Sequence, residues 1–322
     1  MNQSTARTWA TNLKERLRDT WCHQLYHSIK KAKRSLLRQS EGEAILLARY
    51  HRVHGKPLNM KMPKTFTEKL FWRMITWNRG VNPVFSQLTD KYSVRTHVAC
   101  SIGDTYLIRL LWHGENPRTI PFDRLLERYV MKSNHASHQV IVVNGPVERA
   151  DLIESGSAWL DSNYYWEDRE YQYYGIKPRI MIEERLENPD GSLPLDYKLW
   201  CFNGVPEIIQ VINHTRDKSS YFDRTWTLLD LSYTTSSKVE RLPLPITKPT
   251  HLEEMIAIAS KLSVGFGFVR VDLYDVNERV YFGELTFTPT AGYMKLQQDS
   301  WDAWLGEKWD LSLEHQPPTA WK

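Results

Sequence analysis

The chain has 322 residues, of which 41% are hydrophobic and 25% are charged, and its formal net charge is +4. This composition is typical of a globular protein and excludes a disordered chain, and the length allows one large hydrophobic core or two smaller ones. Only three cysteines are present, far apart and in no CxxC motif, which argues against a disulfide framework or a zinc ribbon.

Hydropathy gives no sign of a membrane span. No segment approaches the roughly 20 uninterrupted apolar residues that a spanning helix needs. Residues 1–21 also lack the apolar core of a signal peptide. From these two features we expect a soluble protein of the cytoplasm.

Residues 1–58 predict a basic helical segment ahead of the main body. Within it, residues 30–39 read KKAKRSLLRQ and hold five basic residues but no acidic one. A helix face turned to solvent explains this stretch. Peripheral contact of residues 9–38 with an anionic membrane at the inner face of the cell explains it too, because tryptophan and leucine side chains accompany the charges. No recognition motif accompanies the charges, so nucleic-acid binding is not expected.

The main body, residues 59–322, begins with two predicted helices. Thr65 and Glu68 have the spacing of a capping box and predict the start of the first helix. The second helix is expected to be capped by Thr89 and to end at Gly103. After it, the patterns predict a strand over 105–112, a short helix over 121–128, strands over 129–133 and 140–144 around the polar loop NHASHQ, and a helix over 147–164.

The second half of the body predicts further strands. Apolar runs over 179–186, 195–202 and 205–212 are separated by the turn sequences NPDG and NG. A polar stretch over 213–240 follows. A helix over 250–264, with Thr250 and Glu253 in capping-box spacing, then precedes a final hairpin.

The hairpin, FVRVDLYDVNERVYFGELTFTPTAG at 268–292, places acidic side chains among apolar ones. A three-residue loop at 277–279 would set Asp272 opposite Glu284, whereas a two-residue turn would break that pairing. Phe282, Glu284 and Thr286 would then share one face. Like charges facing each other across a ladder are destabilising unless a cation lies between them. The hairpin therefore indicates an Mg²⁺ site, although an ordinary solvent-exposed face is the alternative interpretation.

Lysines and acids recur at the ends of the predicted strands. Ammonium groups can neutralise phosphate oxygens, and carboxylates can hold the Mg²⁺ that bridges them, so this mixture suits a nucleoside triphosphate. No P-loop, GxGxxG or kinase catalytic motif is present. The side chains concerned are Lys91, Lys132, Lys198, Glu183, Glu184, Asp196, Asp272 and Glu284.

Five segments in order, TDKYSVR, VMKSNHAS, IMIEERL, DYKLWCFNG and the hairpin, resemble the ATP-grasp fold and, within it, the TupA-like group associated with bacterial surface polysaccharide and teichuronopeptide synthesis. The resemblance covers about residues 60–310. It implies an α+β fold in which two α+β subdomains enclose ATP, here with an N-terminal helical extension. The lid subdomain would span about residues 126–205.

The resemblance also implies roles for individual residues. Lys91, Lys132 and Lys198 would reach the phosphates, and the loop from Ser133 to Ser137 would cover them, although it lacks the glycines common in other members. Glu183 or Glu184 would face the nucleotide, since strand alternation allows only one of them to do so. Mg²⁺ would be held by Asp272, Glu284 and Thr286, with threonine where many members carry asparagine. Arg270, together with Lys132, would act in catalysis by steadying an acyl phosphate.

The function implied is that of an ATP-dependent carboxylate-amine ligase, with ATP and Mg²⁺ as cofactors. It would join a small-molecule or glycan carboxylate to an amine through an acyl phosphate, in the synthesis of a capsule, an O-antigen or a teichuronopeptide. Two alternatives stay open: a glycosyltransferase of the same pathway, and an ATP-binding partner that has no catalytic activity. The sequence identifies neither the substrates nor the oligomeric state.

Overall fold

A computed structural model describes residues 21–235 and 239–315 of the chain, with side chains from residue 37 to 314. The chain divides into two compact units, residues 1–45 and 46–322. Helix α2 (Trp21–His54) confirms the helical prediction over its own length. The apolar anchors expected before residue 21 and the basic side chains at 30–34 lie outside what is described. No helix in the described ranges is long and apolar enough to cross a membrane.

The predicted helices at the start of the body are confirmed in part. α3 (Phe66–Arg79) begins with the capping box, in which Thr65 accepts from the Glu68 amide and the Glu68 carboxylate accepts from Thr65. The helix expected after Thr89 is α5 (Val94–Ile102), which ends at Gly103 as predicted but has Ser93 and not Thr89 at its N-cap; the separate helix α4 (Pro83–Thr89) before it was not predicted. The Asp90 carboxylate accepts from the Tyr92 amide and the Ser93 hydroxyl, which replaces helical hydrogen bonds at the break.

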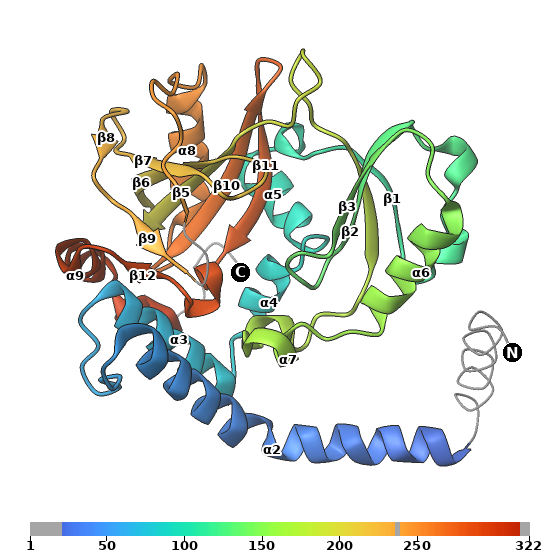
Figure 1. Ribbon diagram of the computed structural model, residues 1–322, viewed down its shortest axis with the longest axis horizontal. Helices are drawn as coiled ribbons and strands as arrows, with labels where there is room; N and C mark the ends of the chain where they lie inside the picture. Colours follow the sequence, from blue (N-terminus) through green and yellow to red (C-terminus); the bar gives the residue numbers. More distant parts are fainter. Residues whose placement is uncertain (1–20, 236–238, 316–322) are drawn as a thin grey trace, which may run out of the picture. The chain divides into compact units, whose positions relative to one another are not determined.

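A four-stranded antiparallel sheet, here the small sheet, has the order β1-β4-β2-β3 (Figure 1). Its strands are β1 (Leu110–Gly114), β2 (Arg128–Ser133), β3 (Val140–Asn144) and β4 (Ile180–Glu184). Helix α6 (Arg149–Leu160) contributes Leu152 to the apolar cluster on one face of this sheet. The short elements nearby are η1 (Asp104–Tyr106), η2 (Pro117–Thr119), η3 (Phe122–Arg124), α7 (Tyr165–Asp168) and η4 (Tyr171–Tyr173). The helix expected over 121–128 is therefore only one 3₁₀ turn.

A six-stranded antiparallel sheet, here the large sheet, has the order β11-β10-β5-β6-β7-β8. Its strands are β5 (Asp196–Phe202), β6 (Val205–Ile212), β7 (Ser219–Phe222), β8 (Leu228–Leu229), β10 (Val269–Val276) and β11 (Arg279–Thr286). β7, β8 and β9 (Tyr233–Thr234) all fall in the polar stretch where the sequence predicted no strand. The remaining elements are α8 (Leu252–Ser263), η5 (Pro289–Gly292), β12 (Lys295–Leu296), α9 (Asp299–Lys308) and η6 (Leu311–His315).

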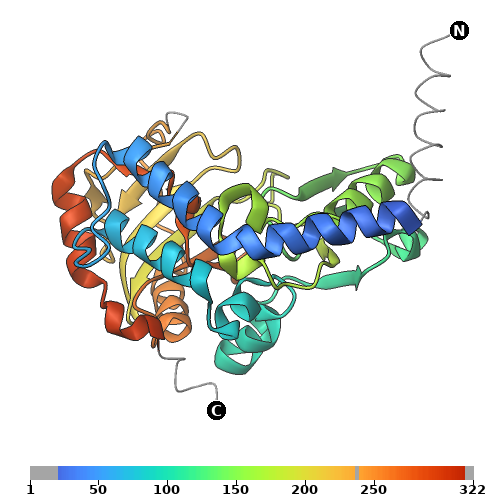
Figure 2. The ribbon, with the colours of Figure 1, turned by 90° about the horizontal axis from the view of Figure 1, so that it is seen from below.

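Alternation along the strands divides the large sheet into two faces. Leu199, Val271 and Leu285 point into an apolar core that α4, α5 and α8 complete. On the opposite face, Trp200 and Phe268 pack into a second core with α3 and α9, and these two helices lie side by side in Figure 2. The second core covers only part of its face, and the rest carries charged side chains.

The start of α8 differs from the prediction. Its N-cap is His251, and no side-chain capping bond forms, so the expected capping box of Thr250 and Glu253 is wrong. His251 is instead held by Asp275 of β10, which accepts from its backbone amide and contacts its ring Nδ1 at 2.9 Å. A tertiary contact has replaced the local one.

The sheets also qualify the expected lid subdomain of about 126–205. β1 precedes that range but pairs with β4 in the small sheet, while β5 lies inside the range but pairs with β10 in the large sheet. Along the chain, the boundary of the compact units falls between Ile45 and Leu46, whereas the sequence analysis placed it after residue 58. The domain division itself stays a prediction.

Candidate functional site

The β10–β11 hairpin pairs Asp272 with Glu284, but by another route than the one predicted. The turn has two residues, Asn277 and Glu278, both with the positive φ that this tight turn requires. Pairing runs regularly from the turn to Leu273 and Phe282, after which a bulge lets Glu284 oppose Asp272. The prediction of a three-residue loop is wrong, and so is the inference that a two-residue turn would break the pair.

The bulge also changes which face of the sheet the side chains of β11 point to on its two sides. Phe282 points into the apolar core with Leu285, so the expectation that it shares a face with Glu284 and Thr286 is wrong. Gly283 is the extra residue, and a Cβ there would lie 3.0 Å from the Asp272 carbonyl oxygen and 3.1 Å from the Tyr274 ring. The close approach of the two strands therefore favours glycine at the bulge.

Asp272 is the centre of a buried charge network. Arg270 donates to it from Nε and Nη2 at 2.6 Å each, and Lys198 Nζ donates to Oδ2 at 2.6 Å. The three side chains are exposed by only 6–10%. Arg270 Nη2 also donates to Thr286 Oγ1 at 3.0 Å. Asp272 is thus the counter-ion that stabilises two buried cations, Arg270 and Lys198.

Glu284 differs from Asp272 in exposure and contacts. Its side chain is 34% exposed, and the nearest cationic nitrogens are Arg270 Nη2 at 3.6 Å and Lys91 Nζ at 3.8 Å. Burial acts to raise the pKa of Glu284, but the surrounding cations, Lys91 foremost, hold that pKa well below its ordinary value. An ionised carboxylate with free lone pairs therefore faces the space between the sheets.

That space is a pocket of about 390 Å³ between the two sheets, here the charged pocket. The volume lies in the range of ligand sites, which is roughly 300–1,000 Å³. The apolar part of the lining comes from the small sheet and the connections around it, with Ile108, Val130, Val142, Leu186 and Leu193. The polar part, most of it ionic, includes eight of the predicted site residues: Lys91, Lys132, Ser137, Glu183, Glu184, Lys198, Asp272 and Glu284.

The structure shows how Glu183 and Glu184 differ. Glu183 is buried, and its carboxylate contacts Lys132 Nζ at 2.5 Å and Arg95 Nη1 at 3.2 Å. Glu184, the last residue of β4, is partly exposed and lines the edge of the charged pocket. Arg95 lies on α5, and nothing in its local sequence pointed to this contact.

The loop between β2 and β3 is tied to the start of α5. Asn134 Nδ2 donates to Asp90 Oδ1 at 2.8 Å, and Lys91 Nζ donates to the Ala136 carbonyl oxygen at 2.8 Å. His138 has a φ of 63°, in the left-handed region that glycine favours. The loop thus makes its turn without glycine. Burial lowers the pKa of Lys91, while the nearby Glu284 carboxylate acts in the opposite direction.

Three predicted residues do not line the charged pocket. Ser133 is fully buried, and its hydroxyl has no hydrogen-bond partner among the residues that the structure describes. Arg270 and Thr286 lie behind Asp272 and Glu284, and Thr286 Oγ1 donates to Glu284 Oε1 at 3.2 Å. The structure also brings in residues that the sequence analysis missed, His214 and Arg216, from the β6–β7 turn.

The donor set around Glu284 fits a hard divalent cation. Carboxylate and hydroxyl oxygens are the ligands that Mg²⁺ prefers, and Mg²⁺ is commonly held by one or two carboxylates together with substrate phosphates. Across residues 37–235 and 239–314, no cluster of three or more His, Cys, Asp or Glu side chains could hold a metal by itself. The residues present therefore fit an Mg²⁺ that arrives with a nucleotide better than one held by protein alone.

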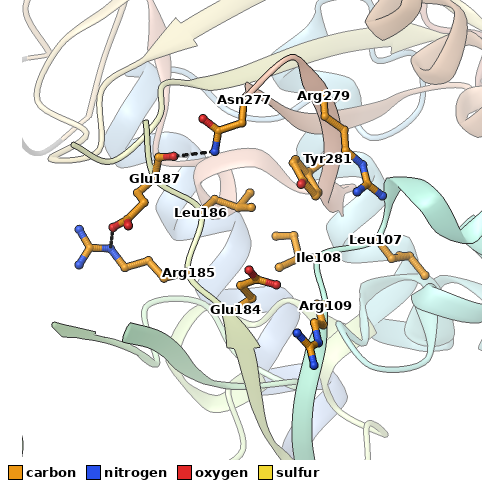
Figure 3. Close-up of a pocket in the computed structure, with 10 residues that line it drawn as sticks. All are labelled: Leu107, Ile108, Arg109, Glu184, Arg185, Leu186, Glu187, Asn277, Arg279 and Tyr281. Carbon is orange, nitrogen blue, oxygen red and sulfur yellow. Dashed lines mark hydrogen bonds and ion pairs between the residues drawn. The ribbon is translucent and has the colours of Figure 1, made fainter. Parts of the chain in front are cut away.

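A second pocket of about 400 Å³ shares Ile108, Glu184 and Leu186 with the charged pocket. Figure 3 shows Ile108, Leu186 and Tyr281 pointing toward one another at its middle, with charged side chains around them. Asn277 Nδ2 donates to the Glu187 carbonyl oxygen at 3.1 Å, which connects the hairpin turn to the β4–β5 connection. Of the predicted site residues, only Glu184 lines this pocket.

Comparison with known proteins gives a family. A sequence model described as TupA-like ATPgrasp matches residues 68–310. No curated protein matches the chain. D-alanine–D-alanine ligase from Bacillus anthracis is 18% identical over 63% of this chain and 58% of its own, with a TM-score of 0.39. Phosphoribosylamine–glycine ligase from Thermotoga maritima is 14% identical over 65% and 51%, with a TM-score of 0.40.

A third solved structure, the ATP-grasp ligase PsnB with a phosphomimetic variant of its minimal precursor, Mg and ADP, is 12% identical over 70% of this chain and 58% of its own, with a TM-score of 0.35. The chain thus spans 51–58% of the length of these three structures. Likeness at this level carries no argument about activity. The family match, in contrast, covers more than half of the chain and confirms both the resemblance and the α+β ATP-grasp fold expected from the sequence. The protein belongs to the TupA-like ATP-grasp family.

Proposed function

We propose that the protein is an ATP-dependent ligase that joins a carboxylate to an amine. The observation that carries the proposal is the charged pocket, whose lining combines aliphatic side chains with cations and carboxylates. A nucleotide needs both kinds of contact, because its base is largely apolar and its phosphates are charged. Family membership favours this reaction over the glycosyltransferase alternative, and the intact ionic lining supports a catalytic protein over an inactive ATP-binding partner.

The adenine would lie against the aliphatic side chains Val130, Leu186 and Leu193. The phosphates would then extend toward Lys91, Lys132 and Lys198, where ammonium groups can donate charge-assisted hydrogen bonds. Lys132 and Lys198 are held in place by the carboxylates of Glu183 and Asp272. Such preorganisation reduces the free energy lost in ordering side chains when a ligand binds.

Mg²⁺ would be held by Glu284, with Thr286 orienting that carboxylate and with Asp272 offering the lone pairs that its two cations leave. When bound, the ion would neutralise charge on the phosphate oxygens. The role of the protein side chains is to position it. Arg270 is fixed by two hydrogen bonds to Asp272 and lies behind the lining of the charged pocket, so it would act on the acyl phosphate by positioning the Asp272 carboxylate.

In the reaction, a carboxylate oxygen of the substrate would attack the γ-phosphorus of ATP, and the bond to the β-phosphate oxygen would break to release ADP. The amine nitrogen would then attack the acyl carbon, the carbon–oxygen bond to phosphate would break, and the amine would lose a proton. Positioning and electrostatic stabilisation suffice for both steps, so no covalent nucleophile of the protein is required.

For the substrate class, we propose a glycan or uronic-acid carboxylate and an amino-acid or amino-sugar amine, in the synthesis of a bacterial surface polysaccharide such as a capsule, an O-antigen or a teichuronopeptide. Support comes from the association of TupA-like proteins with such polymers. The proposed location is the cytoplasm, with peripheral contact to the inner face of the membrane through residues 9–38.

The test of the reaction is ADP release. Purified protein with Mg²⁺ and ATP should release ADP when a screen of uronic-acid glycans and amino acids includes the right pair, and hydroxylamine should trap the acyl phosphate as a hydroxamate. Lys132→Met serves as the inactive control. Transfer that requires a sugar nucleotide, without ADP release, would show that the proposal is wrong.

A further inference from the structure

The β6–β7 turn carries a cation of the charged pocket whose role the proposed reaction leaves open. Arg216 lines this pocket, and its guanidinium makes no hydrogen bond or ion pair with any residue in the described part of the chain. The other cations there are engaged: Lys132 with Glu183, Lys198 with Asp272, and Lys91 with a backbone carbonyl. Arg216 is therefore available to an anion from outside the protein.

The backbone that carries Arg216 is held by its neighbours. Asn213 Nδ2 donates to Thr215 Oγ1 at 2.6 Å and to Asp217 Oδ1 at 2.7 Å, while Asn213 Oδ1 accepts from the Lys218 amide at 3.0 Å. The Arg216 amide donates to the Asn213 carbonyl oxygen at 3.0 Å. These hydrogen bonds hold the turn closed. They therefore fix the backbone position of Arg216.

Arg216 also has an unfavourable backbone conformation. Its φ is 59°, in the left-handed region that costs a residue other than glycine free energy. Strain of this kind collects at functional sites, and glycine or asparagine would occupy the position more cheaply. The Arg216 side chain is exposed, so an anion can reach it from solvent.

The field of Arg216 reaches the part of the pocket where phosphates would lie. After burial and nearer charged groups, Arg216 lowers the pKa values of both Glu284 and Lys91. Lys91 and Glu284 are the residues proposed to contact the phosphates and the ion between them. A guanidinium can bind two phosphate oxygens at once in a planar, bidentate geometry, which an ammonium cannot do.

We propose that Arg216 binds the γ-phosphate of ATP from the large-sheet side, while Lys132 approaches the phosphates from the small sheet. This inference rests on the proposed function, because it requires a nucleotide in the charged pocket. It adds a phosphate-binding residue in the β6–β7 turn, which the motifs along the chain did not indicate.

The test compares two nucleotides that differ in the γ-phosphate. Titration calorimetry would measure the affinities of Mg·AMP-PNP and Mg·ADP for the wild-type protein, Arg216→Gly, Arg216→Lys and the control Arg224→Ala. Arg224 is an exposed arginine on the next turn, β7–β8, and lies outside the charged pocket. Arg216→Gly should weaken AMP-PNP binding by about tenfold or more, as expected for a lost hydrogen bond to a charged group. ADP affinity should stay nearly unchanged, and Arg216→Lys should retain part of the AMP-PNP affinity.

Stability provides an independent check. Glycine suits a φ of 59°, so Arg216→Gly should melt no lower than the wild-type protein, and a loss of affinity then cannot be assigned to unfolding. Equal weakening of ADP and AMP-PNP, or no weakening of either, would overturn the γ-phosphate contact. If the wild-type protein binds neither nucleotide, the proposed function fails as well, so the two failures can be told apart.

Discussion

Asp272→Asn is expected to destabilise the protein strongly even without ligands. The carboxylate accepts three hydrogen bonds of 2.6 Å from Arg270 and Lys198, and all three side chains are at most 10% exposed. An asparagine keeps one acceptor oxygen but turns an NH₂ group toward a cationic donor. At least one buried cation then loses its counter-ion, a change that costs about 3–5 kcal/mol in comparable cases.

The lower end of that range applies here because both cations retain other contacts. Lys198 Nζ lies 3.4 Å from Asp196 Oδ2, and Arg270 still reaches Thr286 at 3.0 Å. We therefore expect a loss of about 3 kcal/mol in the free energy of unfolding. Glu284→Gln, in contrast, removes ion pairs of 3.6 and 3.8 Å from a side chain that is 34% exposed, and the amide oxygen can still accept from Thr286 Oγ1. That change should cost less than about 1 kcal/mol.

Thermal and urea unfolding without nucleotide or metal would measure the difference between the two variants. For a protein of this size, a loss of about 3 kcal/mol corresponds to a fall in melting temperature of roughly 4–6 °C. Glu284→Gln should melt close to the wild-type protein and yet lose Mg²⁺-dependent nucleotide binding. If Asp272→Asn melts within 1–2 °C of Glu284→Gln, on the order of experimental error, the buried network does not hold the site as argued.

Three further changes test other parts of the site. Lys132→Met should weaken ATP binding by about 1.5–3 kcal/mol, and unchanged affinity in calorimetry would speak against a phosphate contact. Gly283→Ala brings a Cβ to 3.0 Å from the Asp272 carbonyl oxygen, so turnover should fall, whereas the control Gly175→Ala meets no atom within 4 Å and should change nothing. Burial raises the pKa of Glu170 from 4.5 to about 8, so the native state holds a proton that the unfolded chain releases, and the free energy of unfolding should fall between about pH 4.5 and 8. Glu170→Gln should flatten that fall in urea titrations at several pH values, and an unchanged slope would contradict the assignment.

Membrane contact by residues 9–38 is a separate proposal, and liposome co-sedimentation measures it. Each basic residue near an anionic surface contributes about 1 kcal/mol, so Lys30, Lys31, Lys33 and Arg34 could together support weak, salt-sensitive attachment. Protein with all four changed to glutamate should stay in the supernatant while the wild-type protein sediments at low salt. Identical behaviour of the two proteins would leave a solvated helix face as the explanation.

Several features could be read from the sequence because they depend on near neighbours. The capping box of Thr65 and Glu68, the strand that carries Lys132 and the alternation around Asp272 all arise from residues a few positions apart. Segment order along the chain was enough to indicate the family. Local hydrogen bonds and side-chain periodicity survive folding when no tertiary contact competes with them.

Other features were decided only by the tertiary structure. Gly283 adds one unpaired residue to β11, and nothing in the alternation marks it, because a bulge depends on the partner strand. His251 is fixed by Asp275 and not by the expected capping box. Arg216 reaches the charged pocket through a turn whose second strand, β7, was not predicted. In each case the position depends on a contact with another segment of the chain, and a pattern confined to one segment carries no information about its partner.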